Sequence, residues 1–97
     1  MAGETRFEWD RRKSEANRGK HGLTFETAVQ VFADPLKSID LEGDEHGEIR
    51  WRATGEIGGT LHVVSYTIRK KNQEEIIRII SARKATPRER ETFEETP

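Results

Sequence analysis

The most regular apolar pattern in the first third of the chain has the spacing of an α-helix. Four apolar residues recur at i, i+3, i+4 and i+7 and share one helical face, namely Phe25, Ala28, Val29 and Phe32. Thr24 has the side chain of an N-cap. Asp34-Pro35 ends the helix, because a residue that precedes proline avoids the helical conformation. The pattern predicts a helix between these two signals.

A shorter helix is predicted before it, over about residues 11–18. Asp10 can cap its start and Gly19 can end it. Its apolar content is low. Phe7 and Trp9 alternate with a polar residue, so they fit a short extended segment or a hydrophobic anchor.

Strand patterns begin after the proline. Residues 37–41 fit a short strand, and residues 40–47 fit an acidic, glycine-containing turn. Residues 49–57 alternate between apolar and polar positions, which predicts a strand with one face toward a core. One face carries Ile49, Trp51, Ala53 and Ile57, and the other carries Arg50, Arg52, Thr54 and Glu56.

Two further strands follow a hairpin signal, Gly58-Gly59. Residues 61–68 return from this turn, and residues 70–74 form a second, polar turn. Residues 75–82 form a last strand whose isoleucines occupy both faces. Such a strand is typically central or covered on both sides.

The sharpest local signal is Thr86-Pro87-Arg88-Glu89, a capping box with proline at the first helical position. It opens a helix over about residues 87–95, which has one large apolar residue, Phe93.

The order of these elements predicts an α+β fold. We expect a three- to four-stranded antiparallel sheet with two N-terminal helices and a C-terminal helix, all packed on one sheet face. We also expect a single domain over residues 1–97, with residues 1–6 and 94–97 as loose ends.

The charge balance gives little support to a function in nucleic-acid binding, because proteins that bind nucleic acids usually have a clear excess of basic residues. The 97 residues contain 17 Lys and Arg against 18 Asp and Glu, a net charge of −1. Only residues 11–21 are locally basic, while acids gather at 40–48 and 89–95. The absence of cysteine excludes disulfides and fits a reducing cytoplasm. No signal peptide or membrane-length apolar run is visible, so we expect a cytoplasmic protein without membrane contact.

The three histidines form no metal-binding motif. His21, His46 and His62 lie far apart, outside any HxxxH or HExxH pattern. The sequence also lacks a phosphate-binding glycine loop, and no serine lies in a nucleophile elbow. We therefore expect no metal site and no cofactor.

The remaining candidates for chemistry are cationic residues on or beside the predicted strands. They are Arg50, Arg52, Arg69, Arg78 and Arg83, with Lys20 and His21 before the second helix. RNA cleavage without a metal needs a base for the 2′-hydroxyl, an acid for the leaving 5′-oxygen and cations that stabilise the phosphorane. Arginine binds phosphate bidentately and keeps its charge, while histidine exchanges protons near neutral pH.

Each candidate also has a structural interpretation. Arg78, between isoleucines, fits a buried ion-pair partner, and Arg52 fits a solvated sheet face. His21 can cap the end of the preceding helix. Arg83 follows the last strand and is better placed to reach a substrate. From the residues alone, the sequence predicts a small α+β domain with arginines near strand ends.

Three stretches, covering about residues 7–93, together resemble the BrnT family of toxins. The first contains Phe7-Glu8-Trp9-Asp10, Lys13, Asn17, Lys20-His21-Gly22, Phe25-Glu26, Ala28 and Val31-Phe32-Ala33-Asp34-Pro35. The second contains Glu48-Ile49-Arg50-Trp51, Gly55, Leu61, Val63-Val64, Tyr66-Thr67 and Arg69. The third runs from Arg78 to Thr86, with Glu89.

The resemblance implies a type II toxin, a metal-independent endoribonuclease that inhibits translation, with a fold similar to that of the RelE-like toxins. It implies an RNA substrate and a ribbon-helix-helix antitoxin, through which the complex would bind promoter DNA. The positions carried over are Lys20, His21, Arg50, Arg69, Arg78 and Arg83. With Arg52 added, the expected site has catalytic residues Lys20, His21, Arg50 and Arg83, and RNA-binding residues Arg52, Arg69 and Arg78.

Two positions depart from the family pattern. Phe93 stands where tyrosine is expected and lacks its hydroxyl, and His62 replaces an aliphatic residue. The alternative is therefore a non-enzymatic interaction module, or an inactive homologue that acts through its partner. Direct DNA binding by this chain is a third hypothesis, but no helix-turn-helix pattern supports it.

Overall fold

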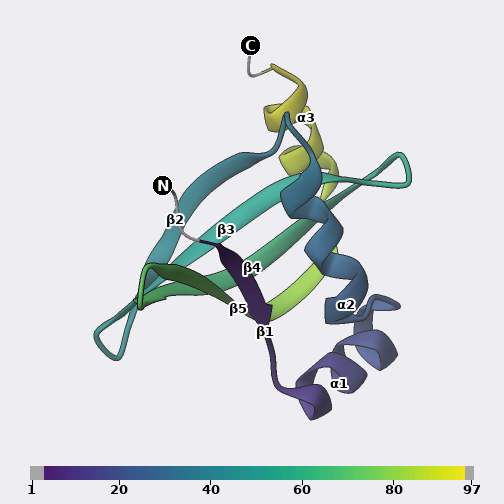
Figure 1. Ribbon diagram of the computed structural model, residues 1–97. Helices are drawn as coiled ribbons and strands as arrows, with labels where there is room; N and C mark the ends of the chain where they lie inside the picture. Colours follow the sequence, from purple (N-terminus) through teal and green to yellow (C-terminus); the bar gives the residue numbers. More distant parts are fainter. Residues whose placement is uncertain (1–3, 96–97) are drawn as a thin grey trace.

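The computed structural model describes residues 4–95, apart from the side chain of Glu45. Its five strands form one mixed sheet in the order β1-β5-β4-β3-β2 (Figure 1). The strands are β1 (Thr5–Glu8), β2 (Ser38–Glu45), β3 (Glu48–Ile57), β4 (Thr60–Lys71) and β5 (Glu74–Lys84). β1 runs parallel to β5, and all other pairs are antiparallel. The α+β class is confirmed, but the expected wholly antiparallel sheet of three to four strands is wrong.

The fifth strand, β1, comes from the segment expected to be an extended piece or an anchor. Phe7 pairs with Ile77 of β5 and packs on the core. Thr5 and Arg6 therefore belong to the sheet and not to a loose end. At the other end of the chain, α3 (Pro87–Glu95) includes two residues of the expected loose tail. Residues 1–3 and 96–97 lie outside the described residues.

Three two-residue hairpins connect β2 to β5. All six central residues have positive φ, the conformation of type I′ turns, which match the twist of the strands. The turns are His46-Gly47, Gly58-Gly59 and Asn72-Gln73. The turn expected over residues 40–47 is thus confined to two residues. Its acidic residues lie on β2, an edge strand where they stay solvated.

Helix α1 (Arg11–His21) begins as expected, since the Asp10 side chain accepts hydrogen bonds from the backbone N–H groups of Arg12 and Lys13. It continues through Gly19 and ends at Gly22, which has a φ of 71°. The predicted end at Gly19 is therefore wrong. A glycine inside a helix is tolerated, whereas the left-handed cap requires a residue such as Gly22.

The predicted second helix divides into α2 (Phe25–Ala28) and the 3-10 helix η1 (Val29–Ala33). Thr24 caps it as expected. The 3-10 segment has fewer residues per turn, so it shifts the buried face from the predicted stripe to Val31. η1 lies close against β3, because a Cβ at Gly55 would come within 3.1 Å of the Val31 carbonyl oxygen. The Asp34 carboxylate reinforces this contact by accepting the Glu56 N–H at 2.8 Å.

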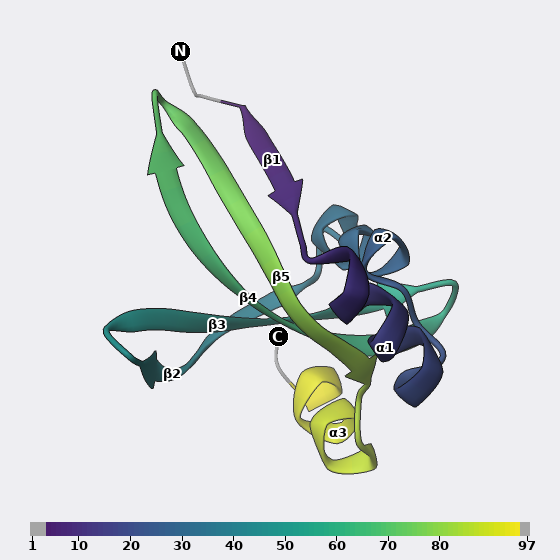
Figure 2. The ribbon, with the colours of Figure 1, turned by 90° about the horizontal axis from the view of Figure 1, so that it is seen from below.

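We call the sheet face under α1, α2 and η1 the covered face, and the opposite one the open face (Figures 1 and 2). The covered face holds the main core, which comprises Leu23, Phe25, Ala28, Val31, Ala53, Val64, Tyr66, Ile77, Ile79 and Ala82. α3 instead packs its Phe93 on Leu61 and Val63, which alternate with the core residues of β4 and so belong to the open face. The expectation that all helices share one face is wrong for α3.

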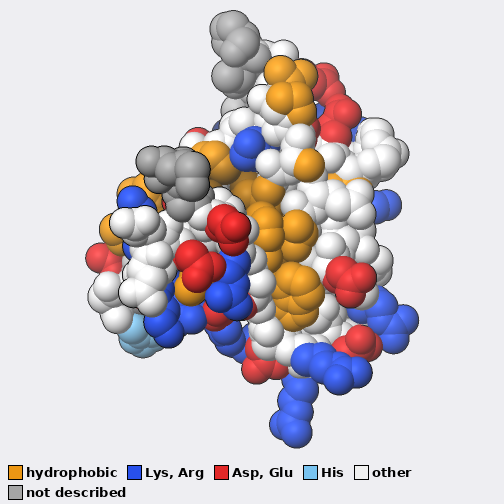
Figure 3. Space-filling model, viewed as in Figure 1, with side chains coloured by type: hydrophobic (Ala, Val, Ile, Leu, Met, Phe, Trp, Pro, Cys, Tyr) orange, Lys and Arg blue, Asp and Glu red, His pale blue; other side chains and the backbone are white. Residues whose placement is uncertain are grey.

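The helices cover only part of the covered face. Ile39, Leu41, Ile49 and Ile68 pair with or follow core residues on this side, yet they remain 37–63% exposed. Figure 3 shows apolar side chains running down the middle of this face.

The two edges of the sheet differ in whether their backbone groups have hydrogen-bond partners. Beyond the end of β1, the Asn17 side chain closes the β5 edge by bonding both the N–H and the C=O of Ala82, as a neighbouring strand would. β2 pairs only with β3 among the described residues, so its outer edge is open. That edge strand carries Asp40, Glu42 and Asp44.

Candidate functional site on the open face of the sheet

All five arginines expected at the site lie on the open face. Arg50 and Arg52 alternate with Trp51 and Ala53, which pack in the main core, as the sequence predicted. Arg83 is paired with Val63, Arg78 with Thr67, and Arg69 follows two residues later on the same strand as Thr67. Three adjacent strands thus concentrate positive charge on one side of a chain whose net charge is −1.

Two of these arginines share one carboxylate at the β1 side of the face. Glu8 accepts hydrogen bonds from Arg78 at 2.8 Å and from Arg69 at 2.9 Å, one on each oxygen. The Arg78 hydrogen bond lowers the pKa of Glu8, and Arg69 adds to the effect. Arg78 is the predicted ion-pair partner, but its side chain is 45% exposed, so the prediction of a buried pair is wrong. β1, the unexpected strand, brings Glu8 to this position.

Arg83 is held by the capping box that opens α3. Its guanidinium donates to both oxygens of Glu89, at 2.7 and 3.0 Å. Glu89 also accepts the N–H of Thr86, while its own N–H donates to the Thr86 hydroxyl, so the box forms as predicted. The hydrogen bond from Arg83 is the main cause that lowers the pKa of Glu89 to about 2. The orientation of Arg83 therefore depends on the start of α3.

Arg52 differs from these three, because it has no ion-pair partner among residues 4–95. It lines a cavity of about 400 Å³ between β2, β3 and α3. Asp40, its register partner on β2, and Phe93 of α3 line the same cavity. Thr54, Thr86 and Glu89 also line this cavity.

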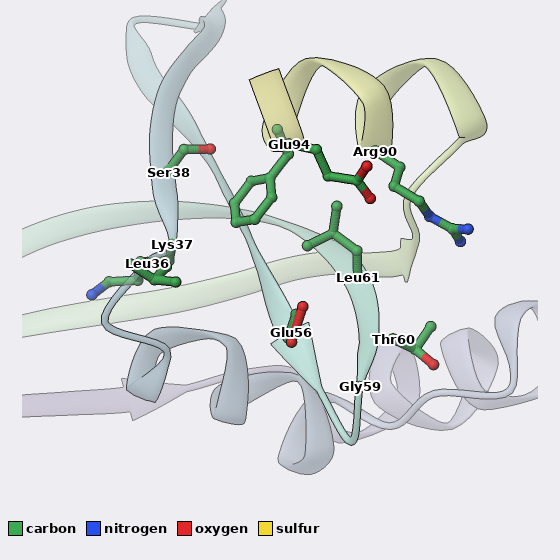
Figure 4. A pocket seen from close by; sticks show the side chains of 10 residues that line it. Leu36, Lys37, Ser38, Glu56, Gly59, Thr60, Leu61, Arg90 and Glu94 are labelled. Carbon is green, nitrogen blue, oxygen red and sulfur yellow. The ribbon is translucent and has the colours of Figure 1, made fainter. Parts of the chain in front are cut away.

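A second cavity, of about 720 Å³, lies on the other side of α3 (Figure 4). Leu61 forms its floor, and Leu36 and Lys37 stand opposite Arg90. Phe93 lines this cavity as well as the first. With space on both sides, α3 rests on the sheet through Phe93 and the bond between Glu89 and Arg83.

The structure does not bring Lys20 and His21 together with the arginines. Both are exposed in the last turn of α1, a helix that lies beside β5 (Figure 2). Within the described residues, no hydrogen bond or ion pair joins them to the open face. His62 is buried on the covered face, where its Nδ1 lies 2.9 Å from the Thr60 carbonyl oxygen.

Sequence reasoning missed the carboxylates of the site, Glu8, Glu42 and Glu89. Glu42 reaches across β3 and accepts a hydrogen bond from the Ser65 hydroxyl at 2.7 Å. The capping box did single out Glu89, but only as a helix signal. The partners of Glu8 and Glu42 lie between 23 and 70 residues away in sequence, so no local pattern revealed them.

The face combines phosphate-binding cations with carboxylates that can orient them or accept protons. Within residues 4–95, no three His, Cys, Asp or Glu side chains gather in a way that could hold a metal ion. In the same part of the chain, no helix has the length and apolar composition needed to cross a membrane.

The comparison with protein families agrees with the resemblance noted from the sequence. None of the curated proteins compared matches this chain. Residues 9–89 match the family described as the ribonuclease toxin, BrnT, of type II toxin–antitoxin systems. The matched segment includes Arg50, Arg52, Arg69, Arg78 and Arg83. It spans well over half of the sequence, and the chain therefore belongs to the BrnT family of type II ribonuclease toxins.

Proposed function

We propose that this toxin is an endoribonuclease that cuts RNA on the open face of its sheet. The observation that carries the proposal is the gathering of five arginines on that face in a chain of net charge −1. Arginine forks match phosphate geometry, and they stabilise the extra charge of a pentacoordinate phosphorane. In this proposal the 2′-hydroxyl attacks the neighbouring phosphate without a metal ion, and loss of RNA inhibits translation.

The roles expected from the sequence remain part of this proposal. Arg50 and Arg83 stabilise the reacting phosphate, while Arg52, Arg69 and Arg78 hold the RNA chain. Lys20 and His21, also expected to be catalytic, would have to reach the substrate from α1.

A type II system has a protein antitoxin as its partner. We propose that this antitoxin is a ribbon-helix-helix protein and that promoter DNA is bound only through the complex. The expected similarity to RelE-like toxins also stays a prediction.

RNA cleavage by the purified toxin tests the proposal directly. Wild type should release fragments ending in a 2′,3′-cyclic phosphate, with and without a chelator, and Arg83→Ala should cleave about 100-fold more slowly. His21→Ala measures the expected proton transfer. Arg18→Ala is the matched control, because Arg18 lies on α1 and pairs with Glu15. Intact RNA after incubation with folded wild type would refute the function, and cleavage abolished by the chelator would refute the metal-independent reaction.

One observation favours the alternative, a non-enzymatic interaction module or inactive homologue. Arg69, Arg78 and Arg83 are already paired with Glu8 and Glu89, as structural anchors would be. Strong expression of the toxin without its antitoxin separates the two. Growth arrest with RNA loss, relieved by Arg83→Ala, favours the ribonuclease, whereas normal growth with tight antitoxin binding favours the module.

A further inference from the structure

Glu42 owes its position to an irregularity in β2. The pairing of β2 with β3 shifts between Leu41 and Gly43, so Glu42 is an extra residue in a β-bulge. Bulges redirect side chains and are common beside active sites. Leu41 still pairs with Trp51 on the covered face, while the Glu42 side chain turns to the open face. Gly43 then resumes the pairing opposite Arg50.

The Glu42 carboxylate lies among the groups that would bind the reacting phosphate. Its Oε1 accepts the Ser65 hydroxyl at 2.7 Å, and Ser65 is the register partner of Arg52. The carboxylate is also close enough to Arg83 to help raise the pKa of that guanidinium. One carboxylate, one hydroxyl and two arginines from four strands thus meet at the centre of the open face.

Glu42 differs from the other two carboxylates of the site in what its oxygens bind. Both oxygens of Glu8 and both oxygens of Glu89 accept hydrogen bonds from arginines. Proton acceptance there would break an ion pair. Glu42 has only the Ser65 bond among the described residues, which leaves Oε2 available. The Ser65 hydroxyl on one oxygen fixes the carboxylate of this exposed residue and leaves the other oxygen able to accept a proton.

We propose that Glu42 is the general base of the RNA cleavage reaction, with Ser65 as its positioning residue. The inference rests on the proposed function and assigns to Glu42 the role that the sequence offered to His21. Glu42 Oε2 takes the proton of the 2′-hydroxyl as the 2′-oxygen bonds to phosphorus. The bond between phosphorus and the 5′-oxygen breaks, and that oxygen takes a proton from water. Arg50 and Arg83 stabilise the phosphorane while Arg52 holds the RNA beside them, and the product ends in a 2′,3′-cyclic phosphate.

The inference is tested by cleavage rates measured from acid to neutral pH on one RNA. The proteins compared are wild type, Glu42→Gln, Ser65→Ala and Asp40→Asn. Asp40, the register partner of Arg52, is the other carboxylate that β2 presents to the open face. Glutamine keeps the size of the side chain but accepts no proton, so we expect Glu42→Gln to lower kcat at least 100-fold. Its rate should also lose the rise with pH on the acid side. Ser65→Ala should cause a smaller loss and keep that rise, because the base is still present. Binding of an RNA with 2′-O-methyl groups, which cannot react, should change less than about threefold in Glu42→Gln.

Asp44→Asn is the matched control. It removes an acid from the same strand, but Asp44 pairs with Ile49 on the covered side and should leave the rate and its pH profile unchanged. Thermal unfolding of each variant confirms that it is folded. Wild-type kcat and pH profile in Glu42→Gln would overturn the inference while leaving the ribonuclease intact, as would loss of the acid limb in Asp40→Asn alone. No cleavage by folded wild type would overturn both the inference and the proposed function.

Discussion

The two faces of the sheet are built from alternate residues of the same strands, yet they differ in almost every physical property. The covered face buries Phe25, Val31 and Val64 almost completely under three helical segments. The open face carries arginines on the residues that alternate with these core positions along the same strands, together with the carboxylates that bind them. The short helix α3 contacts only one end of the open face, mainly where Phe93 packs against Leu61 and Val63.

This difference separates stability from chemistry within a small protein. Burial of apolar area on the covered face supplies most of the stabilisation. Charged residues on the open face can therefore serve to bind RNA with little effect on the free energy of unfolding. The net charge of the chain conceals this division, since it is near zero while five arginines gather on the open face.

The largest effect is expected from a cavity on the covered face. Phe25 is 1% exposed, so Phe25→Ala should lower the free energy of unfolding by about 3–5 kcal/mol. Urea unfolding followed by circular dichroism measures this change. A loss below about 1 kcal/mol would show that the covered face does not carry the stability of the fold.

A smaller effect, confined to activity, is expected on the open face. Arg52 has no ion-pair partner among residues 4–95, so its charge is free for substrate. Arg52→Ala should reduce RNA cleavage about 100-fold, equivalent to about 2.7 kcal/mol, and change the free energy of unfolding by less than about 0.5 kcal/mol. Cleavage assays and urea titrations on the same preparation check both numbers. Equal losses of stability and activity would contradict the division between the faces.

Removal of the α3 anchor should have an intermediate effect on stability. Phe93 is half-buried between two cavities, and Phe93→Ala should lower the free energy of unfolding by about 1–2 kcal/mol. Hydrogen exchange should quicken in α3 while β4 and β5 stay protected. Glu91→Ala, at an exposed position of the same helix, is the control. Uniform loss of protection through the sheet would mean that α3 belongs to the main cooperative unit.

The last effect comes from the bond between Glu89 and Arg83, and it becomes smaller as the pH falls. The pKa of Glu89 falls from an ordinary 4.5 to about 2 on folding, so its carboxylate stabilises the fold fully above pH 4.5. That contribution disappears as pH falls toward 2. Because solvent screens the partly exposed pair, Glu89→Gln should cost about 1–2 kcal/mol at pH 7.

Melting temperatures of wild type and Glu89→Gln between pH 7 and pH 2.5 measure this contribution. The difference in melting temperature between wild type and Glu89→Gln should become smaller as the pH falls. Glu91 is an exposed acid on the same helix, so Glu91→Gln should melt at the same temperature as wild type across this pH range. A constant gap across the range would mean that the hydrogen bonds with Arg83 and Thr86 do not depend on the charge of Glu89.

Local signals in the sequence predicted much of this architecture. The caps at Asp10, Thr24 and Thr86 start their helices where expected, because each bonds backbone groups within three residues. The alternation across β3 placed Arg50 and Arg52 on the side away from the core, since side-chain direction in a strand depends only on position.

Contacts between distant segments could not be predicted in this way. β1 has four residues, and its pairing with β5 depends on a parallel register that no turn specifies. Without β1, nothing placed Glu8 beside Arg69 and Arg78. The bulge that turns Glu42 toward Ser65 lies in a stretch that reads locally as an acidic turn. The carboxylates of the site were therefore hidden, while the arginines were not.

The open outer edge of β2 has a further consequence for solubility. An unpaired strand of eight residues with exposed Ile39 and Leu41 is a template for edge-to-edge aggregation. When two copies meet there, Asp40, Glu42 and Asp44 repel their counterparts, so charge keeps the edges apart. The acidic residues of β2 thus protect an otherwise open edge, and their replacement by uncharged residues would favour association of the folded toxin at this strand.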